Sequence, residues 1–315
     1  EQAVGVKLEP LDRRIEADSI EYPHVKVTID RAGRVANVLV EGPATPAPAD
    51  AAGALAQGHA FWPLALAREL DDALLHLRLN ETEIGQLVVR AEGDPSLVLG
   101  YDRLLEAGAN DWLLREVRLL WKRVLKRLDM TSRSVIALIE PGSCFAGTLL
   151  ELALAADRSV MLEGTFSGDS RPAPVLIPGS LNFGTYPMGN GLSRLATRFW
   201  GEPEAVDRIR ERIDQPLDAD AATELGLVTF TYDAIDWNDE IRIMLEERAS
   251  FSPDALTGME ANLRFPGPET METRIFGRLT AWQNWIFQRP NAAGDEGALK
   301  RYGTGVQPNY DRKRV

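Results

Sequence analysis

The stretch Pro141–Asp157, PGSCFAGTLLELALAAD, begins with small residues and continues as an apolar segment that carries one carboxylate, Glu151, before its final residue. The residues just before it, SVIALIE at 134–140, form an apolar run that predicts a buried strand. A strand that passes through Pro-Gly into a helix leaves the first N–H groups of that helix without internal partners. Together with the helix dipole, these groups favour a negative charge at this point of the chain.

Glu151 follows Gly147 by four residues, about one helical turn, so both are expected on the same side of the helix. The leucines around Glu151 predict a helix that is buried nearly all round. A carboxylate there must be paired, reach solvent or have a raised pKa. Two interpretations stay open. Glu151 is either an acid–base group beside a bound acyl oxygen, or a structural carboxylate bonded to Arg158 or to a backbone group.

Composition limits the class of protein. The chain has 315 residues, 44% hydrophobic and 26% charged, as in soluble globular proteins. The net charge of -12 argues against nucleic acid as a general partner. The single cysteine, Cys144, excludes an intrachain disulfide and fits a reducing, cytoplasmic location. We expect Cys144 to be a small packing residue rather than a nucleophile. No apolar run reaches the ~18 residues of a membrane span, so no membrane association is expected.

The histidines do not predict a metal site. The chain has three, His24, His59 and His76, and their spacing matches no pattern of metal ligands. We therefore expect neither a metal nor a redox cofactor, and we expect acid–base chemistry to use carboxylates, a tyrosine or water.

Strand and helix patterns alternate along most of the chain. Strands are predicted at Val25–Asp30, Val35–Glu41 and within GQLVVRAEG at 85–93, and helices at Leu64–Leu79 and Trp112–Leu128. This alternation predicts an α/β fold with largely parallel strand pairing.

After about residue 238 the strand patterns fade. Helices are expected in DEIRIMLEERASF at 239–251 and METRIFGRLTAWQNWIFQ at 271–288, and the tail from Arg301 is expected to be extended. An apolar group in the second helix is expected to be core, with a subunit contact as the alternative; its members are Trp282, Trp285, Ile286 and Phe287.

Four segments in order resemble the enoyl-CoA hydratase/isomerase (crotonase) superfamily over roughly residues 23–240. The first two are the Gly147 to Asp157 segment with its ELALAAD run, and VVRAEGDPSLVLGYDRLLE at 88–106, which is similar to the first oxyanion loop. The others are SLNFGTYPMGNGLSRLATRFWG at 180–201 and LDADAATELGLVTFTYD at 217–233. The matched positions are Gly100, Asp102, Gly147, Glu151, Gly184, Pro187, Gly191, Arg194 and Leu195.

The resemblance implies an α/β fold with a crotonase-like ββα spiral core and a C-terminal helical region. The expected divisions are an N-terminal extension at 1–22, the core at 23–240, and the helical region with its tail at 241–315. We expect Arg194 either to support the loop beside the site or to form a surface ion pair. Asp157 is expected to be structural, and Asp102 to cap the helix that begins DRLLE.

The resemblance also implies a site for an acyl-CoA thioester, with coenzyme A present only as part of the substrate. Backbone N–H groups of Tyr101 and of Gly147 or Thr148 would form the oxyanion hole, and Glu151 would be the catalytic carboxylate. The residues expected to line the substrate are Leu99, Gly100, Ser180 and Gly191. Ser180 stands where hydratases carry a second glutamate, which disfavours a hydratase that uses two glutamates around one water.

The Trp-rich C-terminal region and the tail resemble crotonase-type lyases that open the dihydroxylated ring of a benzoyl-CoA thioester. That reaction cleaves a carbon–carbon bond with water and releases formate and an aldehyde acyl-CoA. These lyases carry two crotonase-like halves, and the chain is similar to the second; its start without methionine fits a piece of a longer protein. Two alternatives stay open, a degenerate half that supports assembly and another crotonase-type isomerase or hydrolase. The expected partner is a companion half or a second copy.

Overall fold

The computed structural model describes residues 5–314, and its centre is one eight-stranded sheet in which neighbouring strands follow chain order. The first four strands pair antiparallel and the pairs from β4 to β8 are parallel. The strands are β1 (Arg14–Ile15), β2 (Ser19–Glu21), β3 (Val25–Asp30), β4 (Val35–Glu41), β5 (Gln86–Glu92), β6 (Ser134–Ile139), β7 (Arg158–Leu162) and β8 (Phe230–Tyr232). The parallel pairing expected from the alternating pattern therefore holds for the second half of the sheet.

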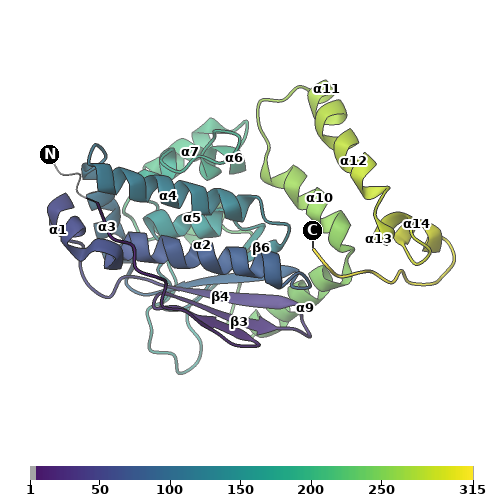
Figure 1. Ribbon diagram of the computed structural model, residues 1–315, viewed down its shortest axis with the longest axis horizontal. Coiled ribbons are helices and arrows are strands. Elements are labelled where there is room, and N and C mark those ends of the chain that lie inside the picture. The colour runs from purple at the N-terminus through teal and green to yellow at the C-terminus, as the bar shows by residue number, and fades with distance from the viewer. Residues whose placement is uncertain (1–4, 315) are drawn as a thin grey trace.

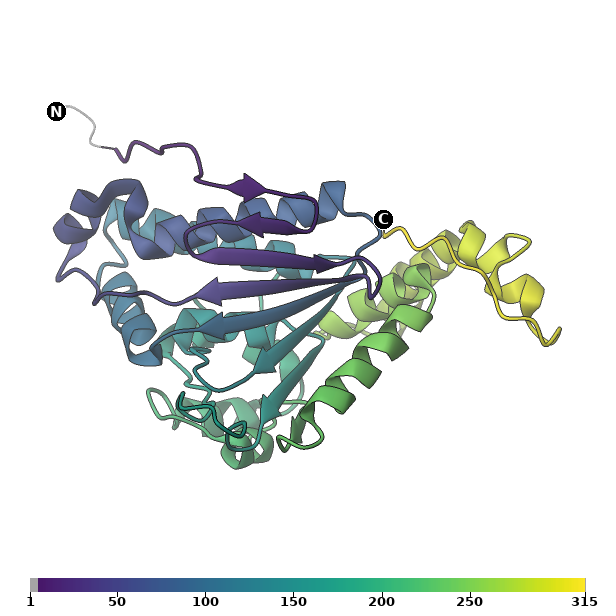
Figure 2. The same ribbon diagram turned by 90° about the horizontal axis from the view of Figure 1, so that it is seen from below.

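Helices cover the two faces of the sheet unequally. One face carries most of the core under α1 (Ala51–Gln57), η1 (Gly58–Ala60), α2 (Trp62–Asn80), α3 (Pro95–Ala107), α4 (Trp112–Asp129) and α5 (Gly147–Leu154) (Figure 1). The other face packs against α9 (Trp237–Ser250), which crosses it in Figure 2. The predicted helices at 64–79 and 112–128 are confirmed as α2 and α4.

Short helices complete the region between β7 and β8. They are η2 (Ser180–Phe183), α6 (Arg194–Arg198), α7 (Pro203–Arg210) and α8 (Ala219–Glu224). The C-terminal part adds α10 (Pro253–Arg264), α11 (Met271–Thr273), η3 (Arg274–Leu279), α12 (Thr280–Ile286), α13 (Pro290–Ala293) and α14 (Ala298–Arg301). The helix α10 was not predicted, although Ser252 is its N-cap and Pro253 its first residue.

The C-terminal helices α11 to α14 project away from the sheet and its helices (Figure 1). The expectation that the Trp282–Phe287 group is core is wrong, because α12 contains no buried residue and Phe287 is 50% exposed. Trp282 and Trp285 instead pack edge to face, with ring centroids 5.3 Å apart. The expectation of an extended tail from Arg301 holds only in part, because Arg301 ends α14 and residues 302–305 form turns; residues 306–314 have no helix or strand. Among residues 5–314 no helix combines the length and apolar character needed to cross a membrane.

Arg264 joins α10 to the core. Its Nε donates to Asp157 Oδ1 at 2.7 Å, and its guanidinium also donates to the main-chain oxygens of Thr131 and Arg133, at 2.5 and 2.8 Å. Asp157, which follows α5, also accepts the N–H of Val135 on β6 at 2.7 Å. This buried cluster therefore connects α10 to the end of α4, to β6 and to the end of α5, and Asp157 has the structural position expected for it.

We predict that Arg264→Gln lowers the free energy of unfolding by about 3–5 kcal/mol, because removing one partner leaves a buried carboxylate without its cation. Urea unfolding followed by circular dichroism measures the change. Arg242→Gln is the matched control, since Arg242 forms exposed pairs with Asp239 and Glu246 on α9. Equal midpoints for the two variants would contradict the structural role of Arg264.

Candidate active site

The helix α5 begins at Gly147, directly after the irregular segment that follows β6. Gly147 has φ +46°, and a Cβ placed there would lie 1.8 Å from Asp102 Oδ2, so only glycine fits this position. Its N–H donates to the main-chain oxygen of Ile177 at 3.0 Å. Gly147 thus lies where the sequence placed it, but its N–H is already bonded.

Thr148 faces a carboxylate from its own chain. Its N–H donates to Asp102 Oδ2 at 2.6 Å, and its hydroxyl donates to Asp102 Oδ1 at 2.5 Å. The Thr148 hydroxyl also lies 3.1 Å from the hydroxyl of Tyr186. Asp102 therefore occupies the position at the start of α5 where the sequence analysis expected an acyl oxygen.

Asp102 is 4% exposed, and burial raises the pKa of its carboxyl to about 7, although the hydrogen bonds from Thr148 oppose the shift. A carboxylate without a paired cation is costly to bury, and protonation removes that cost. At neutral pH this group is therefore close to its midpoint between the charged and neutral forms.

The helix α3 corrects two expectations about its residues. Tyr101 lies in the interior of α3 rather than at its start, so its N–H belongs to the helix ladder and is not an oxyanion donor. Asp94 is the N-cap of α3 and accepts the N–H of Ser96 at 2.8 Å, so Asp102 does not cap it. The aromatic ring of Tyr101 packs against Phe61 and Trp62.

The residues expected to line a substrate do not surround one open site. Leu99 is buried, and its Cδ2 lies close to Gly147 and Gly179. The Ser180 hydroxyl donates to Glu106 on α3 at 2.6 Å. Gly191 lies in an exposed turn with φ +84°, and Gly100 has an open surface position on α3.

Glu151 is 1% exposed and is fully engaged by neighbouring side chains. Its Oε1 accepts from Asn182 Nδ2 at 2.7 Å, and its Oε2 accepts from an amino group of Arg194 at 2.8 Å. Burial raises its pKa, and the charge of Arg194 opposes that rise. The alternative of a paired carboxylate holds, but the partner is Arg194 and not Arg158.

Arg194 is 2% exposed, so the expectation of a surface ion pair is wrong. Besides Glu151 it binds Asp129 at the end of α4, with Nε–Oδ1 and Nη2–Oδ2 distances of 3.0 and 2.6 Å. Cys144 is fully buried, and burial raises the pKa of its thiol to about 12, which fits the expected packing role.

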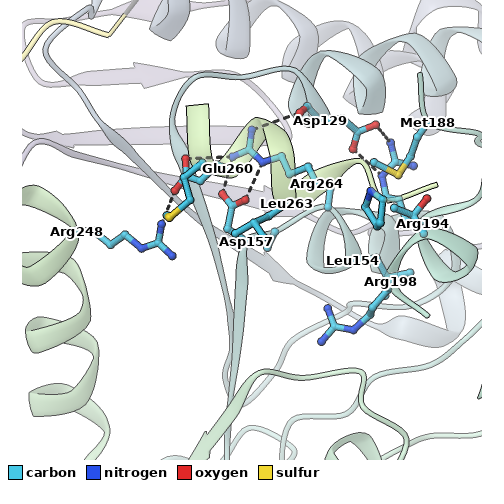
Figure 3. Close-up of a pocket in the computed structure, with 15 residues that line it drawn as sticks. Asp129, Leu154, Asp157, Met188, Arg194, Arg198, Arg248, Glu260, Leu263 and Arg264 are labelled. Atoms are coloured by element: carbon cyan, nitrogen blue, oxygen red, sulfur yellow. Dashed lines mark hydrogen bonds and ion pairs between the residues drawn. The ribbon is translucent and has the colours of Figure 1, made fainter. Parts of the chain in front are cut away.

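A cavity of about 270 Å³ lies on the far side of Arg194, between the core and α10 (Figure 3). Glu151 is not among its lining residues. Three of the four arginines on its wall, Arg194, Arg248 and Arg264, are paired with carboxylates. The described residues contain no group of histidine, cysteine or acidic side chains arranged to hold a metal.

Sequence patterns did not indicate Asn182, Asp129 or the contact of Asp102 with Thr148. A signal for the last was present, because Asp102 lies four residues after Val98 and three before Leu105, on the apolar side of α3. A lone carboxylate on such a side needs a buried partner, but the sequence does not say which segment supplies it.

Comparisons with known proteins identify the fold and a related sequence. No family model matches the chain. Solved structures of an enoyl-CoA hydratase from Geobacillus kaustophilus HTA426 and an enoyl-CoA hydratase/isomerase from Marinobacter aquaeolei superpose with TM-scores of 0.64 and 0.62, at 17% identity each. They cover 93% and 90% of this chain, and 98% of each solved chain is matched. The chain has the crotonase fold.

A curated relative adds information that the fold does not. The chain is 50% identical over 313 residues to a benzoyl-CoA-dihydrodiol lyase from Aromatoleum evansii, which covers 99% of this chain. The chain spans 56% of the length of that relative. The two sequences are thus related along nearly all of this crotonase-fold chain, and the relative contains a further part.

We predict that Asp102 makes the protein less stable as the pH rises from about 4 to about 7. In this window the unfolded chain has released the proton that the native carboxyl still holds, because the native pKa is near 7 instead of 3.8. The effect amounts to about 4 kcal/mol at most, at 1.36 kcal/mol per pKa unit. Urea unfolding at several pH values measures it.

The variant Asp102→Asn should flatten this part of the pH profile. Asp94→Asn is the control, because hydrogen bonds from Ser96 lower the pKa of this largely exposed carboxyl, which reverses the sign of its contribution. An unchanged slope in Asp102→Asn would show that Asp102 is ionised in the native protein throughout.

Proposed function

We propose that this chain takes part in a benzoyl-CoA-dihydrodiol lyase reaction, in which water opens the dihydroxylated ring of a benzoyl-CoA thioester and formate and an aldehyde acyl-CoA are released. The observation that carries the proposal is the 50% identity along 99% of the chain to a lyase of that name. The crotonase fold is consistent with it, and the Thr148 N–H at the start of α5 would bind an acyl oxygen once Asp102 is displaced.

The chemistry needs an electron sink beside the bond that breaks. The thioester carbonyl supplies one, because its oxygen gains negative charge as an enolate forms, and a well-placed N–H donor stabilises such charge by about 3–4 kcal/mol. The Thr148 N–H supports this role, since it already holds a carboxylate oxygen at 2.6 Å. In the proposed complex the acyl oxygen replaces Asp102, and α3 shifts to admit it.

Glu151 is the carboxylate proposed to move a proton or to position water. Its buried setting raises its pKa, which suits proton transfer near neutral pH. Release from Asn182 or Arg194 would have to accompany substrate entry, because both oxygens are now bonded. Coenzyme A enters as part of the substrate, and the proposed reaction uses no metal or redox cofactor.

A second candidate is a crotonase-fold half that supports assembly while a companion half performs the chemistry. Specific observations favour it: Thr148 and Glu151 are both satisfied by side chains of this chain, and Ser180 is bonded to Glu106. The relative's extra length would provide the companion. The two candidates differ in whether this site ever opens.

The deciding measurement is formate released from the dihydrodiol of benzoyl-CoA by this chain alone. If this chain performs the chemistry, Glu151→Gln should lower kcat at least about 100-fold, the lower range for loss of a general acid–base group. Glu163→Gln is the matched control, because Glu163 is an exposed carboxylate just after β7.

No formate from a chain that is folded by circular dichroism would favour the assembly role. Adding the companion part of the relative would then restore release, and Glu151→Gln would leave that rate unchanged. Absence of release from the combined halves as well would overturn the proposed lyase function.

A further inference from the structure

A second cavity, of about 300 Å³, lies between α4 and the loop that precedes α6. One wall is the α4 side chains Arg115, Arg118 and Lys122, and the opposite wall is Gly184, Thr185 and Pro187. Ala109 and Leu119 complete the lining. None of these residues belongs to the Glu151 network described above.

The charge of this cavity is unusual for the chain. Three lining residues are cationic and none is acidic, although the whole chain has a net charge of -12. Within residues 5–314, Arg118 and Lys122 form no ion pair, and Arg115 has only an exposed contact of 3.5 Å with Glu116. The Nε of Arg118 is buried without a hydrogen-bond partner. The cavity therefore concentrates uncompensated positive charge.

The helix fixes this arrangement. Positions 115, 118 and 122 are spaced by three and four residues, so the three cations share one side of α4. The other side is held in the core by Val117, Trp121 and other apolar residues. Like charges at this spacing repel one another, and because all three side chains start from one helix, the spacing of their backbone positions is fixed. A bound anion would remove that repulsion.

We propose that Arg118, Lys122 and Thr185 form a binding site for a phosphate group. A guanidinium donates two parallel hydrogen bonds to phosphate, and the ammonium of Lys122 adds a point charge. A phosphate dianion neutralises more of the charge of three clustered cations than a singly charged carboxylate does. The Thr185 hydroxyl can donate a further hydrogen bond from the opposite wall.

The site lies close to the start of α5. Tyr186 follows Thr185 directly, and its hydroxyl reaches the Thr148 hydroxyl at 3.1 Å. Two sources share the required chemistry, a phosphate of a coenzyme A thioester and free inorganic phosphate. The inference itself rests on the cavity and its charges, and it does not depend on the proposed lyase function.

The test is calorimetric titration of the folded chain with inorganic phosphate, coenzyme A, dephospho-coenzyme A and acetate at low ionic strength. We expect phosphate or coenzyme A to bind at least tenfold more tightly than acetate, with affinity falling as salt is added. Arg118→Gln/Lys122→Gln should lower that affinity at least tenfold. Arg242→Gln, which removes one charge from α9 on the other face of the sheet, should leave it unchanged.

The different ligands in this titration distinguish a phosphate of coenzyme A from free inorganic phosphate. Tighter binding of coenzyme A than of both dephospho-coenzyme A and phosphate identifies the 3′-phosphate, whereas equal binding of phosphate and both nucleotides identifies a simple phosphate site. Lys122→Gln alone, a change at a half-buried position, serves if the double variant fails to fold, and should weaken binding about threefold or more. Absence of phosphate and nucleotide binding, equal affinity for acetate, or unchanged affinity in the α4 variants overturns the inference.

Formate release and phosphate binding are separate readouts. Loss of the lyase activity with binding intact would count against the proposed function alone. Intact lyase activity with no binding at this cavity would count against the phosphate site alone.

Discussion

One guanidinium, that of Arg194, holds the centre of this molecule together. It lies between Asp129 at the end of α4 and Glu151 in the middle of α5, and all three side chains are buried. Their positions are mutually dependent, because a charge removed from water needs its partners in place. This pairing links the middle of α5 to the end of α4 and, with the buried apolar residues of α5, helps to fix the helix in the core.

At the start of α5, the Thr148 N–H group finds its hydrogen-bond acceptor in a distant part of the chain, which is unusual for a helix terminus. Ordinary N-caps come from the residue just before the helix, but Thr148 is bonded by an aspartate from α3, 46 positions away in sequence. This long-range contact packs α3 against α5 and brings Leu99 close to Gly147. The start of a helix favours a bound anion, and here that anion is the protein's own Asp102 carboxylate. A thioester can use the same donors only by competing with Asp102.

Much of the fold follows from local patterns. The strands Val25–Asp30 and Val35–Glu41 and the helix α4 could be predicted from periodicity, because each has one strongly apolar side and clear end signals. The site could be predicted only in part. The sequence pointed to Gly147, Glu151 and Arg194, yet the pairing of Glu151 with Arg194 and Asn182 spans 43 and 31 positions. Such partners are brought together by tertiary packing, and no periodic pattern in the sequence predicts them.

Tyr101 shows the opposite case. Its position in a motif suggested a loop, but Asp94 and Pro95 are a strong start signal, and the helix that begins there includes Tyr101 in its interior. The helix-start residues Asp94 and Pro95 therefore predicted the structure here better than the motif did. Within the helix, the backbone N–H groups that an oxyanion hole would need are bonded to carbonyl groups of the preceding turn.

The projecting α11–α14 segment divides the chain into regions of different local stability. Because α12 buries none of its residues, its opening exposes little apolar surface and carries little of the free energy that holds the sheet. We therefore expect amide protons in this segment to exchange through local fluctuations, and those of β5 and β6, which are buried almost throughout, to exchange only through larger openings of the core. The protein thus combines a buried sheet with a projecting helical segment that contributes little to the core.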